Sequence, residues 1–134
     1  MAVHISTVHV LVDDPDAALK FHRDAVGLVV VNEAANEGFR WITLGQAGAS
    51  GPVIVLSEPH AGRSREDGDA LAALLAKGEL RPLHLRFDDL DDAFRRIAAA
   101  PGVTVIQAPL DQLWGIRDAA VRDPAGNFLR LEQG

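Results

Sequence analysis

The segment FLRLE, near the end of the chain, places residues of opposite charge side by side on one face of a predicted strand. Alternate residues of a strand share a face, so Phe128, Arg130 and Glu132 lie together, opposite the two intervening leucines. A guanidinium on such a face needs a carboxylate or ligand oxygens. With His9 and His84, Glu132 would form a two-histidine, one-carboxylate set, which is a known ligand set for non-haem iron.

An internal repeat relates these residues to one another. A shift of 75 positions superimposes the two halves of the chain without a gap, which indicates duplication of a unit of about fifty residues. His9 then matches His84, while Arg130 matches Val55 and Glu132 matches Ser57. Further matched pairs are Asp14 and Asp89, Gly27 and Gly102, Gly51 and Gly126, and Leu56 and Leu131.

Each copy predicts the same βαβββ order of elements. In the first copy we expect strands at 5–12, 28–33, 39–44 and 52–57, with a helix at 16–26 that Asp14 caps and Gly27 ends. In the second we expect strands at 83–87, 103–107, 114–121 and 127–132, with a helix at 91–100 capped by Asp88 or Asp89. Between the copies, 60–69 predicts a polar loop and 70–77 a short helix. The prediction is a single α+β domain, 1–134, composed of units 1–58 and 80–134 joined by linker 59–79.

Composition narrows the class of protein. The 134 residues contain no cysteine, which excludes disulfides and thiolate chemistry and favours a reducing cytoplasm. A net charge of −6, with scattered arginines, disfavours nucleic acid and anionic membranes as partners. No segment approaches the ~18 apolar residues of a membrane span. We therefore expect a cytoplasmic protein that binds neither nucleic acid nor membrane.

Topology predicts which side chains face a site. In a βαβββ unit the first and last strands run parallel and can pair, while the helix covers one sheet face and leaves the other concave. Two such concave faces would form a cleft, closed within one chain or across the two chains of a homodimer. The concave positions are Thr7, His9, Leu11, Val53, Val55, Ser57, Pro82, His84, Arg86, Phe128, Arg130 and Glu132.

Two long motifs resemble the vicinal oxygen chelate superfamily, which includes glyoxalase I, extradiol dioxygenases, fosfomycin-resistance transferases and bleomycin-resistance proteins. VDDPDAALKFHRDAVGL resembles the family's strand, aspartate and helix segment, with His22 in the place of a tyrosine. WGIRDAAVRDPAGNFLRL is similar to the family's aromatic-Gly-x-Arg followed by DPxGN. The resemblance covers almost the whole chain and implies the paired βαβββ fold, often assembled as a homodimer.

The resemblance also implies where a metal would be bound. The four family positions fall on Thr7, Val55, Pro82 and Arg130, none of which is a usual metal ligand. We therefore expect no metal or other cofactor at these positions. A displacement of two residues would offer His9, Ser57, His84 and Glu132 instead. The simpler interpretation is that repeat symmetry brings the histidines together and that Glu132 pairs with Arg130 or Arg86.

The function predicted is small-molecule binding, which in the resembling resistance proteins is antibiotic sequestration. The predicted ligand-binding residues are His9, Phe39, Trp41, Ser57, His84, Arg86, Trp114, Arg130 and Glu132, with no catalytic residue assigned. Phe39 and Trp114 match in the repeat and would form paired aromatic walls. If Arg86 and Arg130 compete for Glu132, a spare arginine would meet an anionic or carbonyl-bearing ligand. The alternative is an enzyme, either a lyase or dioxygenase with the displaced metal site or a metal-free one with a cleft histidine as acid or base.

Overall fold

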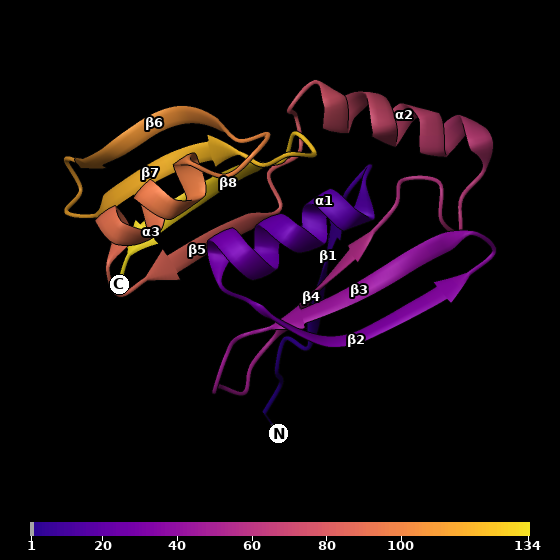
Figure 1. The fold of residues 1–134 in the computed structure, drawn as a ribbon, viewed down its shortest axis with the longest axis horizontal. Coiled ribbons are helices and arrows are strands. Elements are labelled where there is room, and N and C mark those ends of the chain that lie inside the picture. Colours follow the sequence, from indigo (N-terminus) through magenta and orange to yellow (C-terminus); the bar gives the residue numbers. More distant parts are fainter. Residues whose placement is uncertain (1) are drawn as a thin grey trace.

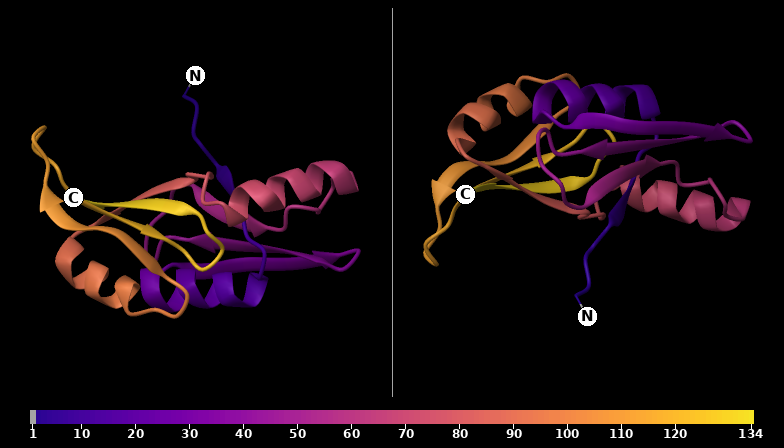
Figure 2. Two further views of the ribbon diagram at one scale, coloured as in Figure 1. Left: turned by 90° about the horizontal axis from the view of Figure 1, so that it is seen from above. Right: turned by 90° about the horizontal axis from the view of Figure 1, so that it is seen from below.

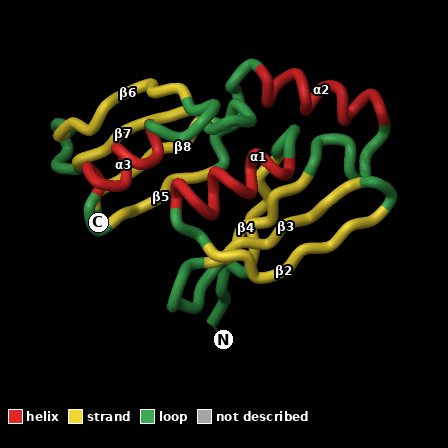
Figure 3. The backbone as a smooth tube through the Cα atoms, in the orientation of Figure 1, coloured by secondary structure: helices red, strands yellow, loops and turns green. Residues whose placement is uncertain are grey.

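The computed structural model describes residues 2–134 and contains the two predicted βαβββ units (Figures 1 and 3). The first unit comprises β1 (Thr7–Leu11), α1 (Pro15–Lys20), the π-helix η1 (Phe21–Val26), β2 (Val29–Asn36), β3 (Phe39–Gly45) and β4 (Val53–Ser57). Helix α2 (Arg65–Ala76) follows. The second unit comprises β5 (Leu83–Phe87), α3 (Leu90–Ala98), β6 (Thr104–Asp111), β7 (Arg117–Arg122) and β8 (Phe128–Gln133). The predicted α+β fold class is confirmed.

The two sheets have the same strand order. The first runs β1-β4-β3-β2 and the second β5-β8-β7-β6. In each unit the first and last strands pair in parallel, with His9 opposite Val55 and His84 opposite Arg130. This pairing places the predicted concave residues of each unit on one sheet face.

Local sequence signals explain where the helices begin and end. The side chains of Asp14 and Asp89 accept hydrogen bonds from the backbone N–H groups of Ala17, at 3.1 Å, and Asp92, at 3.2 Å. These bonds satisfy donors that the first helical turn leaves free. The first helix widens into the π-helix η1 and ends at Gly27, whose φ of 100° is left-handed.

The two units meet through their helices. Phe21, Ala25 and Val26 of η1 pack into the core of the second unit, among residues of α3, β7 and β8. Arg96 Nε of α3 donates a 2.8 Å hydrogen bond to the carbonyl oxygen of Ala25. Figure 2 shows α1 and α3 on one side of the two sheets and α2 on the other. The helix-covered faces of both units therefore contribute to the contact between them.

A second contact between the units comes from the DPAGN turn. The Asp123 carboxylate accepts hydrogen bonds from the N–H groups of Ala125, Gly126 and Asn127. Asn127 Nδ2 then donates a 2.8 Å bond to the carbonyl oxygen of Leu11, at the end of β1. This turn thus links the last strand of one unit to the first strand of the other.

The structure corrects the predicted linker. Helix α2 begins at Arg65, so part of the predicted loop 60–69 is helical. Ser64 caps it by accepting a 3.1 Å hydrogen bond from the N–H of Asp67. The Ser-x-x-acid pattern at 64–67 carried this signal. No helix within residues 2–134 is both long and apolar enough to cross a membrane.

Two further expectations need correction. Trp114 lies in a turn rather than in the predicted strand 114–121, because the N–H of Gln112 bonds the carbonyl of Ile116 at 2.7 Å and β7 starts only at Arg117. The face of β1 opposite the concave one, which we expect the helix to cover, is not buried along its whole length. Val8 remains 41% exposed, although Val10 is fully buried. Because Trp114 lies in a turn whereas Phe39 begins β3, these two residues do not occupy equivalent strand positions.

His22 provides a test of the packing of η1. Its ring is fully buried, and neither ring nitrogen has a hydrogen-bond partner among the described residues. Burial lowers the pKa of His22 from 6.5 to about 4. Between pH 4 and pH 6.5 the imidazole of His22 binds a proton more readily in the unfolded chain than in the folded one. The free energy of unfolding should therefore fall by about 3 kcal/mol as the pH drops from above 6.5 towards 4.

We predict that His22→Phe reduces the difference in unfolding free energy between pH 7.5 and pH 4.5 by about 2 to 3 kcal/mol. Urea denaturation at the two pH values measures this difference. His4→Phe, at an exposed position, serves as the control and should behave like wild type. An unchanged pH dependence in His22→Phe would contradict the prediction.

Candidate functional site

A cavity of about 470 Å³ lies on the concave face of the second sheet. All its lining residues come from the second unit: His84, Gln107, Gln112, Trp114, Ile116, Asp118, Arg130 and Glu132. Four of the nine predicted ligand-binding residues, His84, Trp114, Arg130 and Glu132, are thus brought together. The volume lies within the range of small-molecule sites.

Asp118 of β7 lies at the centre of the polar network in this cavity. Its side chain is almost completely buried and accepts hydrogen bonds from Gln107 Nε2 at 2.9 Å and Gln112 Nε2 at 2.8 Å. Arg130 forms an ion pair with it at 3.3 Å. Burial opposes ionisation, but the two hydrogen bonds and the charge of Arg130 outweigh it, so the pKa of Asp118 lies below its usual value.

Glu132 has separate partners. His84 Nδ1 lies 3.3 Å from Glu132 Oε2, and Arg86 Nη2 lies 3.5 Å from Oε1. The expected competition between the two arginines for one carboxylate is therefore wrong, since Arg130 pairs with Asp118 and Arg86 with Glu132. Neither Arg86 nor Arg130 is therefore left without a carboxylate partner.

The sequence prediction missed Asp118, Gln107 and Gln112. A signal for Asp118 was present, because strand alternation places it on the face shared with Arg130 in an otherwise small and apolar segment, DAAV. The glutamines could not be assigned in this way. Bulges in the pairing of β6 with β7 at Val105 to Gln107 and Gln107 to Leu110 change the register on either side of Gln107.

The remaining predicted residues lie elsewhere. His9, Trp41, Phe39 and Ser57 belong to the first sheet and do not line this cavity. His9 is exposed, Trp41 and Phe39 are half-buried, and Ser57 is buried. Arg86 reaches the cavity only through Glu132. The cavity at Asp118 is therefore formed by one of the two concave faces alone.

The rim of the cavity is apolar and exposed. Trp114, 68% exposed, and Leu113, whose side chain is completely exposed, extend from the turn between β6 and β7. The turn is tied to the cavity floor by Gln112, which bonds Asp118. The turn thus presents an indole beside a polar floor.

The metal positions implied by the family do not fit a metal in this structure. Val55 and Pro82 have no donor side chain, and the guanidinium of Arg130 is already paired with Asp118. In the displaced set, His84 and Glu132 are adjacent but His9 lies on the other sheet. Within residues 2–134 no group of three histidine, aspartate or glutamate side chains is placed to hold a metal ion.

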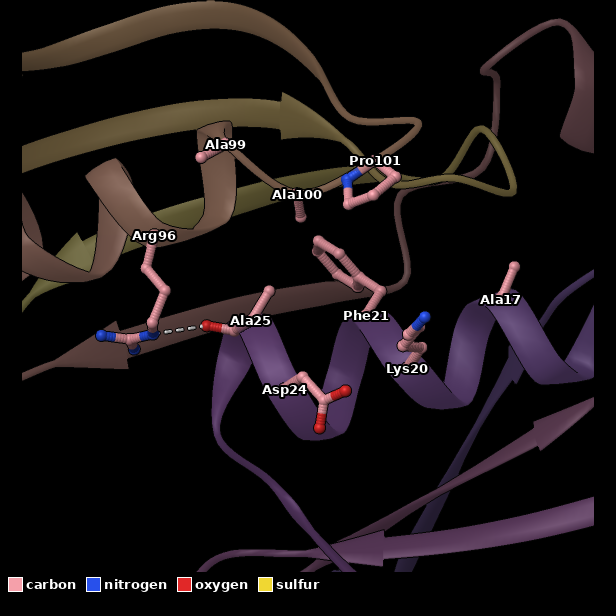
Figure 4. A pocket seen from close by; sticks show the side chains of 9 residues that line it. All are labelled: Ala17, Lys20, Phe21, Asp24, Ala25, Arg96, Ala99, Ala100 and Pro101. Atoms are coloured by element: carbon pink, nitrogen blue, oxygen red, sulfur yellow. Dashed lines mark hydrogen bonds between the residues drawn. The ribbon is translucent and has the colours of Figure 1, made fainter.

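A second cavity, of about 360 Å³, lies between α1, η1 and α3 (Figure 4). Its wall is mainly apolar and includes Phe21, Ala25, Ala100 and Pro101. Arg96 donates to the Ala25 carbonyl there, as the dashed line in Figure 4 shows. The cavity thus lies at the contact between the units and lacks the convergent polar side chains of the concave site.

Comparison with known proteins agrees with this geometry. The model of the Glyoxalase/Bleomycin resistance protein/Dioxygenase superfamily matches residues 3–131, and the chain belongs to this superfamily. The structure of UcmS2 is 27% identical, covers 98% of each chain and superimposes with a TM-score of 0.86. TnmS3, an antibiotic binding protein from Streptomyces sp. CB03234, is 29% identical over 99% of this chain and 98% of its own, with a TM-score of 0.74.

Two further relatives match almost the whole chain. The bleomycin resistance determinant encoded on the transposon Tn5 is 23% identical with a TM-score of 0.62, over 98% of each chain, which supports the fold alone. An uncharacterized protein of Mycobacterium bovis is 28% identical over 136 residues, covering 99% of this chain and 87% of its own length.

The two arginines of the site allow a matched test of the network. We predict that Arg130→Met lowers the free energy of unfolding by about 1 to 3 kcal/mol, because it leaves the Asp118 carboxylate buried without its cation. Arg86→Met should cost less than about 0.5 kcal/mol, because Arg86 is largely exposed. Urea denaturation measures both values. Equal effects of the two variants would contradict the assigned pairing.

Proposed function

We propose that this chain is a small-molecule binding protein of the glyoxalase and bleomycin-resistance type, and that it sequesters an antibiotic-like compound. The observation that carries the proposal is the cavity at Asp118, where hydrogen-bonding side chains converge beneath an exposed indole. Polar groups that fix orientation, together with an aromatic wall, are typical of ligand sites. The antibiotic binding protein TnmS3, at 29% identity, supports this class of function.

The site favours binding over the enzymatic alternative. The ionised Asp118 is held by three side chains, so its lone pairs are engaged and its pKa is lowered rather than raised towards neutrality. A general base is most effective when its pKa lies near the working pH. The family positions for a catalytic metal carry no suitable ligands. Asp118 and its three partners therefore provide structure and recognition rather than proton transfer.

We further propose that the chain works as a homodimer. Its concave faces are open, and large apolar residues are exposed along them and on the strands and turn beside them: Val29, Val30, Val31, Val105, Ile106, Leu110, Leu113, Trp114 and Ile116. Each sheet also has two edge strands, β1 and β2 in the first and β5 and β6 in the second. Pairing the first sheet of one chain with the second sheet of another would cover these surfaces. It would also bring His9, Phe39, Trp41 and Ser57 to the cavity of the partner.

Ligand binding can be tested by a thermal-shift screen of an antibiotic library in the presence of chelator. We predict that hits raise the melting temperature and change tryptophan emission. His84→Ala and Arg130→Ala should weaken the binding of these hits by about tenfold or more, as expected for loss of a charge-assisted or buried hydrogen bond. His60→Ala, in the linker, is the control. If both cavity variants bind a confirmed hit as tightly as wild type, this cavity is not the site.

The dimer can be tested by sedimentation velocity at micromolar concentration. We predict a species with twice the 14.3 kDa mass of the chain, because an exchanged pairing would bury more than ~2,000 Å². Leu113→Lys should weaken association, since this leucine lies beside the open face. Leu74→Lys on α2 is the matched control and should not. A wild-type monomer at this concentration would contradict the proposal.

A further inference from the structure

We infer that the cavity at Asp118 selects a neutral aromatic molecule that donates hydrogen bonds, such as a phenol. The inference rests on the proposed binding function and names the ligand class of the same site. It follows from the way in which the two carboxylates orient their neighbours. Asp118 and Glu132 orient Gln107, Gln112 and His84, which line the cavity with them.

Asp118 fixes the direction of both carboxamides. A carboxylate only accepts hydrogen bonds, so each glutamine must turn its NH2 group towards it. Gln107 Nε2 also donates to the backbone oxygen of Asp118 at 3.1 Å, which confirms its orientation. Within residues 2–134, no donor reaches Oε1 of either glutamine. Both carbonyl oxygens are left as acceptors for a ligand.

Glu132 orients His84 in the same sense. Because a carboxylate only accepts hydrogen bonds, the 3.3 Å contact requires a proton on Nδ1. In the neutral tautomer that carries this proton, Nε2 has a lone pair. Together with the two glutamine oxygens it gives the cavity three acceptors, which a ligand with hydroxyl or N–H groups can satisfy.

The charges of the site disfavour an ionic ligand. Asp118 is paired with Arg130, and Glu132 with Arg86, so the two carboxylates and two guanidiniums cancel. An anion would lose its hydration without gaining a free cation, and a cation would compete with guanidiniums already in place. Trp114 and Ile116 line the cavity and provide apolar surface for a ring. A neutral aromatic donor matches all of these groups.

The test compares three probes of one shape by isothermal titration calorimetry: 2-naphthol, 2-methoxynaphthalene and 2-naphthoate. Wild type should bind 2-naphthol at least about tenfold more tightly than either of the others, because only it is both neutral and a donor. Asp118→Asn should reduce the preference for 2-naphthol over 2-methoxynaphthalene below about threefold, because an asparagine amide can also donate and so no longer fixes the direction of the two glutamine carboxamides. The same variant should improve binding of 2-naphthoate, because Arg130 loses its carboxylate partner.

Two further variants separate the possible results. Gln112→Met removes one acceptor and should also reduce the preference, which keeps the test valid if Asp118→Asn folds poorly. Glu66→Gln removes an exposed charge on α2 and should change nothing. If 2-methoxynaphthalene or 2-naphthoate binds as tightly as 2-naphthol, and Trp114→Ala weakens that binding, the site stands and the inference fails. If no probe binds to wild type, the inference fails, and the thermal-shift screen of the antibiotic library decides the proposed function separately.

Discussion

The buried carboxylate of Asp118 is the group on which the concave site depends. A charge at this depth is tolerated only because a guanidinium and two amides surround it, and each of those groups is thereby fixed in direction. The same bonds hold the Trp114 turn to the floor, since Gln112 belongs to that turn. One acid thus determines the net charge of the cavity, the hydrogen bonds that it offers and the position of its aromatic rim.

The repeat shows that this network is a property of one unit only. In the strand pairing, Thr43 lies between Asn32 and Val55 as Ala120 lies between Gln107 and Arg130. The first-unit positions equivalent to Asp118, Arg130 and Gln107 are therefore Trp41, Val55 and Asn32. They carry no charge, so the first sheet needs no ion pair at its centre. Duplication has therefore produced two faces of the same shape, one ionic and one neutral.

Much of the architecture could be predicted from the sequence, because the repeat, the alternation of residues along strands and the helix caps can each be read from short stretches of the chain. Parallel pairing of the first and last strands of each unit followed from topology, and it places His84 and Arg130 on one sheet face. Strand alternation could have placed Asp118 beside Arg130, but Gln107 could not be assigned, because it bonds Asp118 from a bulged β6. The turn at Trp114 also broke the repeat, since Gly115 at φ 92° allows a reversal where a strand was expected.

The contact between the units bears on why the concave faces stay open. Phe21, Ala25 and Val26 occupy the second unit's core, so the helix-covered faces of the two units are already joined within the chain. A unit has only two broad faces, and the remaining one must meet solvent, a ligand or another molecule. Solvent suits the charged floor of the second sheet but not the valines of β2 or the leucine and indole of the rim. An apolar partner surface above a polar floor would exclude water from the Asp118 network, and its hydrogen bonds would then discriminate more strongly between ligands.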